Sequence, residues 1–422
     1  MKSTHRGITA VGGWTEITPP KPCPLFGYND RPEPYEIILD PLEANAVLVE
    51  SDAARIFLVS LDTLYPSREF LESLRARLSP RILLEPDEIL LAASHTHGAP
   101  ALDPRKPGIG VFSEEYFSFA VEAVAKLLSD IDRCERVSVV PRYSETEADL
   151  GINRRKVVSS PRNGRKRCLL APNPEGVVDR RIPFVGFYGP DGRPVALLWS
   201  AACHPVTATN RRAVTADYPG WGRKRLRKSA GFGIPVLFLQ GFSGDVRPNA
   251  VSADGMAFAP FTPEGRRGWF ERLGTALERG FRELERHGRD GGRRSAGDAF
   301  ALRTESMPLR DFLTGPDADA ALRVRRIDCG PVTIFGIGAE PVASYSELLL
   351  ETFRKESGGD RFLLPAGCID DVFGYLPRNT DLENGGYEAG EFFEVFGVNA
   401  RFRKNVEEAI VPFIQQTCAS HS

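Results

Sequence analysis

Residues 89–100 have the sequence Ile89-Leu90-Leu91-Ala92-Ala93-Ser94-His95-Thr96-His97-Gly98-Ala99-Pro100. The apolar residues that open this segment, followed by turn-forming residues, are typical of a buried strand and its exit loop. Two of the six histidines of the chain lie one residue apart at that exit. Because alternate residues of an extended chain share one face, we expect His95 and His97 to point the same way. The segment predicts a metal site at the end of a strand.

A third histidine follows another apolar run. His204 lies in Ala202-Cys203-His204-Pro205, shortly after the run Val195–Trp199. Two strand ends can therefore present imidazoles to a common point. Imidazole nitrogen and carboxylate oxygen suit zinc, and a hydrolytic zinc site leaves one position open for water. The pattern indicates a metal-dependent hydrolase.

The rest of the chain alternates between predicted strands and predicted helices, which is typical of an α/β fold with mixed β-sheets flanked by helices. We see no internal repeat, and we expect residues 1–422 to form one composite domain, with a possible lobe break near residues 288–297. The predicted strands are residues 54–62, 89–93, 182–188, 195–200, 235–240 and 332–337. The predicted helices are residues 66–78, 114–129, 264–286, 401–415 and a segment through Tyr345 and Phe353.

The composition narrows the class of protein. Of the 422 residues, 42% are hydrophobic and 26% are charged, and the formal net charge is −2, which argues against disorder, a membrane span or a nucleic-acid partner. The seven cysteines form no CxxC pair, so neither a disulfide framework nor a cysteine zinc finger is expected. The first residues contain no apolar signal segment. We expect a cytoplasmic protein with a small-molecule partner, and the oligomeric state is not indicated.

The stretch from residue 155 to residue 181 is strongly basic, with glycine and proline between the charges. We interpret it as a long surface excursion. A solvated loop is the simpler interpretation, and a rim that attracts an anionic substrate is the alternative.

Carboxylates also lie at predicted strand ends. Glu340 follows the apolar run 332–337 and precedes a predicted helix, where a buried carboxylate needs a partner. Capping of that helix is the alternative role for Glu340. Asp62 and Asp245 end other apolar runs, and Asp217 follows the His204 segment. These three acids are candidates for orienting a ligand histidine by accepting a hydrogen bond from its second ring nitrogen.

Taken in order, several motifs of the chain together resemble the catalytic domain of the neutral/alkaline (non-lysosomal) ceramidase family. The resemblance runs from Ile17-Thr18-Pro19-Pro20 to Gly386-Tyr387-Glu388, and the chain looks like a divergent, bacterial-type member. The motifs between these ends are Ser94–Pro100, Gly151–Arg155, Cys203–Thr207, Ala216–Gly220, Gln240–Asn249 and Gly374-Tyr375.

The resemblance implies one Zn²⁺ ion held by His95, His204, Glu340 and Tyr375. Around the metal it implies three further roles: His97 faces the scissile group, Arg154 binds a substrate oxygen, and Tyr387 helps to polarise the carbonyl. Taken singly, the two tyrosines are equally well explained as half-buried aromatics, and Arg154 as one more residue of the basic stretch.

The chain departs from the family at a catalytic position. The family carries a serine two residues after the position of Asp245, and this chain has Arg247 there. A guanidinium stays protonated and is neither nucleophile nor base, so we expect metal-activated water to attack. The planar fork of Arg247 suits a carboxylate or phosphate on the substrate. We also expect the C-terminal β-sandwich extension of the family to be missing, and no long apolar stretch suits a lipid surface.

The leading hypothesis is therefore a zinc-dependent amidase that cleaves an amide (N-acyl) bond of a small polar or anionic substrate. A metal-dependent hydrolase of an ester, lactone or phosphoester is an alternative. The third hypothesis is a homologue that binds a metal and a ligand but is catalytically inactive, because Arg247 replaces the serine.

Overall fold

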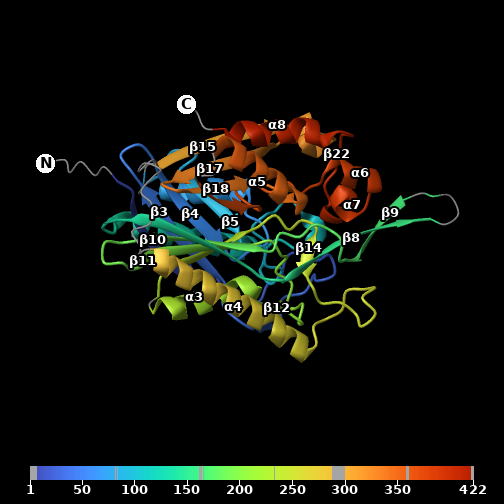
Figure 1. Ribbon diagram of the computed structural model, residues 1–422, viewed down its shortest axis with the longest axis horizontal. Helices are drawn as coiled ribbons and strands as arrows, with labels where there is room; N and C mark the ends of the chain where they lie inside the picture. Colours follow the sequence, from blue (N-terminus) through green and yellow to red (C-terminus); the bar gives the residue numbers. More distant parts are fainter. Residues whose placement is uncertain are drawn as a thin grey trace.

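The structure is a computed structural model that describes residues 7–419, except residues 81, 83, 161–163, 165, 232, 288–299 and 358–360. Helices and strands alternate along the chain, and three sheets of five, four and four strands form its body (Figure 1). The fold is mixed α/β with helices flanking the sheets, as the sequence predicts. The possible lobe break near residues 288–297 falls among residues 288–299, outside the described part of the chain.

The first sheet has the strand order β5-β4-β3-β1-β6. β3 and β4 run antiparallel, whereas β4 and β5 run parallel and are connected through helix α1. Helices α1 and α2 pack against one face of the sheet, for example through Phe70 and Val124. The bounds are β1 (Thr9–Glu16), β3 (Glu43–Glu50), β4 (Arg55–Leu61), α1 (Arg68–Leu78), β5 (Ile89–Ala93), α2 (Glu114–Arg133) and β6 (Val137–Ser138).

The second sheet has the order β13-β11-β10-β7. β10 and β11 form an antiparallel hairpin, and β13 returns parallel to β11 after helix α3. Helices α3 and α4 cover one face, for example through Leu226 and Leu277. The bounds are β7 (Val140–Glu147), β10 (Arg181–Tyr188), β11 (Pro194–Ala201), α3 (Asp217–Ala230), β13 (Val236–Gln240) and α4 (Pro263–His287).

The third sheet has the order β15-β17-β18-β20. β17 and β18 run antiparallel, and β20 returns parallel to β18 after helix α5. Helices α5 and α8 cover one face and lie on the side of the molecule opposite α3 and α4 (Figure 1). The bounds are β15 (Phe300–Pro308), β17 (Ala321–Cys329), β18 (Val332–Ile337), α5 (Ser344–Ser357), β20 (Phe362–Ala366) and α8 (Val406–Cys418).

The three sheets share one topology. In each, three strands pair antiparallel, a helix leads to a fourth strand parallel to the third, and another helix follows. The equivalent third strands are β4, β11 and β18, and the equivalent fourth strands are β5, β13 and β20. The repeat lies in strand order and connection rather than in residue identity, so no repeated motif is visible in the sequence.

The central core lies where the inner faces of the three sheets meet. Neighbouring residues of a strand point to opposite faces. Thus Val47 and Leu198 face the central core, whereas Leu48 and Trp199 face the helices outside. Because both faces of the central strands are buried, their sequences are nearly continuous apolar runs.

The basic stretch forms a hairpin rather than the expected loop. β8 (Gly151–Ser159) and β9 (Lys166–Asn173) pair antiparallel and project from the body of the molecule (Figure 1). The predicted surface excursion is therefore confirmed. The prediction of a loop is wrong, because the main chain of the two basic segments pairs as strands, and composition does not indicate such pairing. Arg162 and Arg165 lie outside the described residues.

One helix boundary also differs from the prediction. The last helix begins at Val406 rather than near residue 401, because Arg401–Phe402 forms β22 and pairs with β16 (Leu313–Thr314). The remaining strands and helices of the prediction agree with the structure to within a few residues.

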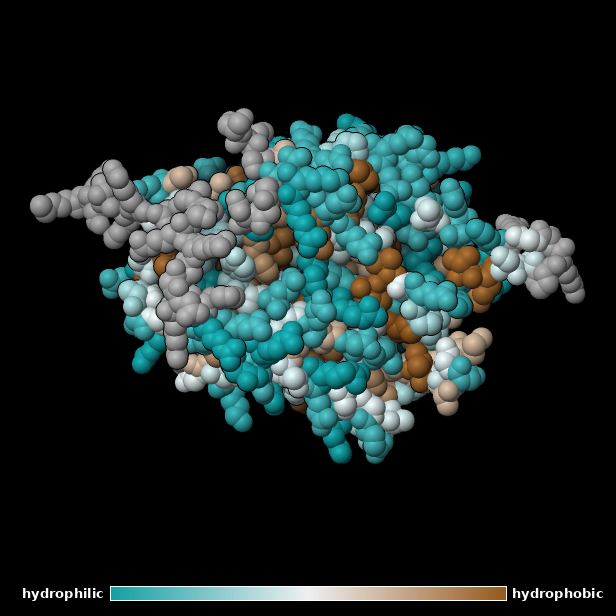
Figure 2. Space-filling view, viewed as in Figure 1, coloured by the Kyte–Doolittle hydropathy of each residue, from teal (hydrophilic) through white to brown (hydrophobic). Residues whose placement is uncertain are grey.

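The face of the molecule in Figure 2 is mainly hydrophilic, with hydrophobic side chains gathered over β8, β14 (Val246–Pro248) and the segment before α4. Exposed apolar residues of these parts of the chain include Val157, Val158, Val251 and Met256. Among the described helices, none has both the length and the apolar character that crossing a membrane requires.

Main-chain hydrogen bonds tie the ends of the central strands together. The amide of Ala93 at the end of β5 donates to Cys368 (3.0 Å), and Gly367 after β20 donates to Gln240 at the end of β13 (2.7 Å). Gly241 in turn donates to Ala201 at the end of β11 (3.1 Å). Ends of strands from all three sheets therefore meet at one place.

A buried ion pair joins the first two sheets. Arg223 of α3 reaches the end of β4, where its Nη1 lies 3.2 Å from Oδ1 of Asp62, and its Nε lies 3.0 Å from Oε2 of Glu43 in β3. All three side chains are buried. Removing one partner leaves an uncompensated charge in the interior.

We predict that Arg223→Ala lowers the free energy of unfolding by about 3–5 kcal/mol, because Asp62 loses its buried counter-charge and Glu43 keeps only Arg227. Arg225→Ala is the matched control on the same helix, since its pair with Glu278 is exposed and is worth about 0–1 kcal/mol. Urea unfolding followed by circular dichroism measures both values. Equal losses in the two variants would contradict the proposed role of Arg223.

Candidate active site

The backbone at His95 departs from the strand that precedes it. β5 ends at Ala93, and His95 takes the left-handed conformation with φ 64°. The two imidazoles do converge, as expected, with ligand atoms within 4.8 Å of one another. The reason given for it, strand alternation, is wrong, since this segment is not extended. A left-handed non-glycine residue is strained and persists only when its surroundings hold it. The Thr96 hydroxyl provides one such restraint, because it donates to the Thr215 carbonyl (2.7 Å).

Each of the three histidines is oriented by a main-chain carbonyl on its Nδ1. Nδ1 of His95 lies 3.0 Å from the Leu64 carbonyl, and Nδ1 of His97 lies 3.2 Å from the Gly27 carbonyl. Nδ1 of His204 lies 2.9 Å from the Ser243 carbonyl. A carbonyl accepts only from a protonated nitrogen, so each Nε2 carries the lone pair that a metal requires.

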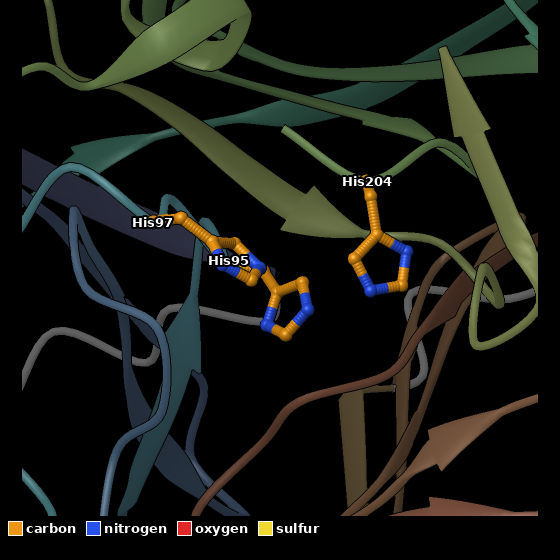
Figure 3. Close-up of side chains that lie close together, drawn as sticks. All are labelled: His95, His97 and His204. Atoms are coloured by element: carbon orange, nitrogen blue, oxygen red, sulfur yellow. The ribbon is translucent and has the colours of Figure 1, made fainter. Parts of the chain in front are cut away.

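The three rings are turned toward one space (Figure 3). Their ligand nitrogens all lie within 4.8 Å of one another, although His204 comes from a different sheet than His95 and His97. His95 and His204 are fully buried and His97 is partly exposed. The structure therefore contains a group of three histidines that could hold a metal ion.

Glu340 completes the cluster from the segment that follows β18 of the third sheet. Its Oε2 lies 3.1 Å from Nε2 of His95 and 3.2 Å from Nε2 of His204. The three atoms are buried, yet none of them makes a hydrogen bond of acceptable geometry. The other oxygen, Oε1, accepts a hydrogen bond from the hydroxyl of Tyr65. Only Oε1 of Glu340 is therefore hydrogen-bonded, to Tyr65, whereas Oε2 faces the imidazoles of His95 and His204.

The electrostatics keep the cluster in the protonation state that binds cations. Burial and the Arg154 cation lower the pKa of His204 to about 4, and burial together with the other two histidines lowers the pKa of His97 well below its usual value. Burial acts to raise the pKa of Glu340, but His95 and His204 hold it well below the usual range. At neutral pH His97 and His204 are neutral and Glu340 is ionised.

A metal ion fits these donors. Ligand atoms that lie about 2.0–2.1 Å from a tetrahedral zinc ion are roughly 3.3 Å from one another. The 3.1 and 3.2 Å separations between Glu340 and the two histidines are close to that value. Atoms at this spacing that make no hydrogen bond are explained by a cation between them.

The structure brings Tyr375 beside Glu340. β19 (Glu340–Pro341) and β21 (Tyr375–Leu376) pair parallel, with Glu340 directly opposite Tyr375. The rings of Tyr375 and Tyr387 lie 5.3 Å apart. Burial, followed by the charge of Glu340, raises the pKa of Tyr375 well above its usual value.

Arg154 lies on the same side of the site as the two tyrosines, with its guanidinium 5.5 Å from the ring of Tyr375 and 5.7 Å from that of Tyr387. The side chain is buried, so it does not belong to the solvated part of the basic stretch. Its Nε donates to Glu388 (2.7 Å), whereas its Nη2 is buried without a hydrogen-bond partner. An oxygen atom of a ligand would satisfy Nη2.

Arg247 lies on β14 next to Arg154. Its guanidinium packs 4.3 Å from the ring of Phe258, and its Nε is buried without a hydrogen-bond partner. Within the described residues it makes no ion pair with an acidic side chain. Burial, followed by the neighbouring Arg154 cation, lowers the pKa of Arg247.

The three candidate supporting acids bond elsewhere. Asp62 pairs with Arg223, Asp217 accepts from Thr207 and Ala208 in the loop after His204, and Asp245 accepts from Asn153 (2.7 Å). Main-chain carbonyls, which any residue can supply, orient the histidines instead. The expectation that these carboxylates contact the histidines is therefore wrong.

Two residues near the site were missed by the sequence analysis. Tyr65 follows β4 and bonds to Glu340, and Glu388 is buried between Arg154 and Arg155, with its Oε2 accepting from Nη1 of Arg155 (2.7 Å). Glu388 directly follows the candidate residue Tyr387, and this adjacency in the sequence could have pointed to it. Tyr65 carries no such signal, because only the packing of two sheets brings it to Glu340.

Comparison with solved structures finds similar folds, among them two ceramidase structures. One is the crystal structure of neutral ceramidase from Pseudomonas aeruginosa, with a TM-score of 0.72 and 14% sequence identity over 98% of this chain and 73% of that chain. The other is a ceramidase complexed with C2, with a TM-score of 0.72 and 14% identity over 98% of this chain and 74% of that chain. No protein-family model and no curated protein matches the sequence. The chain has a ceramidase-like fold.

We predict that Glu388→Ala destabilises the fold by about 3–5 kcal/mol, because Arg154 and Arg155 lose a buried counter-charge. Glu391→Ala is the matched control, since that carboxylate is exposed nearby and its loss is expected to cost less than about 0.5 kcal/mol. Chemical denaturation of both variants checks the difference. A Glu388→Ala protein as stable as the control would contradict the structural role of this carboxylate.

Proposed function

We propose that this protein is a zinc-dependent hydrolase that cleaves an amide (N-acyl) bond of a small polar or anionic substrate. The single observation that carries the proposal is the meeting of His95, His204 and Glu340, whose buried donor atoms face one another without hydrogen bonding. The similarity in fold to ceramidases, which supports an amide rather than another bond, is the second argument.

In this proposal His95, His204 and Glu340 hold the metal, and Tyr375 is the fourth ligand. The side chains are suited to this, because the histidines direct Nε2 toward Glu340 and Tyr375 lies opposite Glu340 in the β19–β21 pair. A bound zinc ion lowers the pKa of water to about 7 and polarises a carbonyl oxygen.

His97 is the candidate for proton transfer. It is neutral at pH 7 and is the only one of the three clustered histidines that is partly exposed. Its Nε2 is buried and makes no hydrogen bond, so it is free to exchange a proton with a group bound beside it. A neutral imidazole can accept a proton from the attacking water and deliver it to the leaving amine.

Arg154 and Tyr387 are the candidates for stabilising negative charge on the carbonyl oxygen. The unpartnered Nη2 of Arg154 is a fixed donor, and Glu388 prevents the guanidinium from turning away. A preoriented donor in a site of low polarity stabilises a developing oxyanion more than water does.

Arg247 favours an anionic substrate. It is half-buried, carries no counter-charge among the described side chains and lies next to Arg154. A carboxylate or phosphate close to the scissile bond would supply the missing charge through a bidentate contact. The same feature favours a phosphoester as the alternative substrate.

We predict that purified protein contains about one zinc ion per chain and that His204→Ala loses it, because one of the few ligands is gone. Inductively coupled plasma mass spectrometry measures the metal, and circular dichroism checks that the variant is folded. Absence of metal from both proteins, even after incubation with zinc, would exclude the zinc site.

We predict chelator-sensitive hydrolysis of N-acyl amino acids. Arg247→Met should lower kcat/KM roughly tenfold to a hundredfold for these carboxylates and leave N-acyl amines without a carboxylate nearly unchanged, since only the former use the guanidinium. Arg193→Met, at an exposed turn, is the control.

The same panel separates the alternatives. Chelator-sensitive turnover of esters, lactones or phosphoesters alone would replace the amidase assignment. Bound zinc with no turnover of any class would support the ligand-binding homologue, and equal losses for charged and uncharged amides would contradict the role of Arg247.

A further inference from the structure

A cleft of about 630 Å³ lies between helices α3 and α4, and none of the residues of the candidate active site lines it. Trp221, Phe261 and Phe270 form its apolar wall. These three rings are half-buried, and the ring centroids of Trp221 and Phe270 lie 5.0 Å apart. A cleft of this size and lining is of the kind that holds small molecules.

Arginines surround the aromatic wall. Arg225, Arg266 and Arg267 line the cleft, and the guanidinium of Arg266 lies 4.7 Å from the ring of Phe270. Arg225 is paired with Glu278 outside the lining, and Glu271 is the acidic residue of the cleft. Arg266 and Arg267 form no ion pair with any described residue, so the lining has a net positive charge.

The position of these two arginines in α4 adds to the excess of positive charge. They are the fourth and fifth residues of the helix, whose first residue is Pro263. The positive end of the helix dipole disfavours cations near a helix start. The Thr262 hydroxyl already accepts from the Gly265 amide (3.0 Å), so the helix start is capped. Glu264 supplies one negative charge in the first turn, against the two positive charges of Arg266 and Arg267. An anion in the cleft would balance both the arginines and the dipole.

We propose that this cleft is a second binding site, for a flat aromatic small molecule that carries an anionic group. The aromatic body would pack on Trp221 and Phe270, and the anionic group would pair with Arg266 and Arg267. Thr209, on the loop that follows His204, lies at the edge of the cleft and offers a hydroxyl. The proposal does not depend on the assignment of the metal site.

The test uses two probes with the same rings. 8-Anilinonaphthalene-1-sulfonate carries a sulfonate, and N-phenyl-1-naphthylamine has no charge. We expect the sulfonate to bind to one saturable site, measured by equilibrium dialysis and by energy transfer from tryptophan, and to bind roughly tenfold more tightly than the uncharged probe. EDTA should leave this binding unchanged.

Variants locate the site. The double variant Arg266→Glu/Arg267→Glu should weaken binding of the sulfonate roughly tenfold or more, whereas Arg279→Glu/Arg282→Glu, with the same change of charge on exposed positions of the same helix, should not. Trp221→Phe should reduce energy transfer while dialysis still detects the probe. Circular dichroism and thermal unfolding confirm that each variant is folded.

Three results would overturn the proposal. One is equal affinity for the charged and uncharged probes, which would show that the arginines do not select the ligand. The second is an equal loss in the two double variants, which would show an effect of overall charge. The third is the absence of saturable binding to the unmodified protein.

Discussion

The meeting of the central strand ends is the constraint on which the rest of the structure depends. Main-chain hydrogen bonds run from Ala93 to Cys368, from Gly367 to Gln240 and from Gly241 to Ala201, so ends of strands from three sheets are locked together. His95 and His204 follow β5 and β11. Glu340 follows β18, whose exit is tied to the same place because the Cys368 amide donates to the Ala339 carbonyl (2.9 Å). A shift of one sheet would separate the ligand atoms by more than a metal can bridge. The precision of the site is therefore a property of the backbone.

The charges of the interior divide into two groups. Arg223 with Asp62 and Glu43, and Glu388 with Arg154 and Arg155, are compensated and hold elements together. Glu340, the unpartnered Nη2 of Arg154 and the unpaired Arg247 are incompletely satisfied. Buried polar groups are normally hydrogen-bonded, so the exceptions indicate where a ligand belongs. Several of the unpartnered buried atoms belong to the candidate site, on His95, His97, His204, Glu340, Arg154 and Arg247, although others, such as Nε1 of Trp199 and Oγ of Ser129, lie elsewhere.

Much of the fold could be predicted from the sequence. Apolar runs such as Ile89–Ala93 identified the strands buried on both faces, and helical periodicity identified α2 and α4. The charged composition of the β8–β9 hairpin predicts a loop, because it lacks the apolar residues by which strands are recognised in a sequence, although the main chain of the two strands pairs. The topology shared by the three sheets could not be predicted from the sequence. Strand order depends on contacts between distant segments, and local sequence patterns carry no information about such contacts.

For the candidate site, the sequence by itself determined the types of ligand atom and their positions after strands, including His95, His97, His204 and Glu340. The resemblance to the ceramidase family also led to the expectation, still a prediction, that Arg247 stands where that family has a serine. Only the tertiary structure decided that these groups meet, that carbonyls rather than Asp62 or Asp245 orient the histidines, and that Tyr65 and Glu388 support the site. The physical reason is that strand exits are local features, whereas the distance between two exits is set by how whole sheets pack.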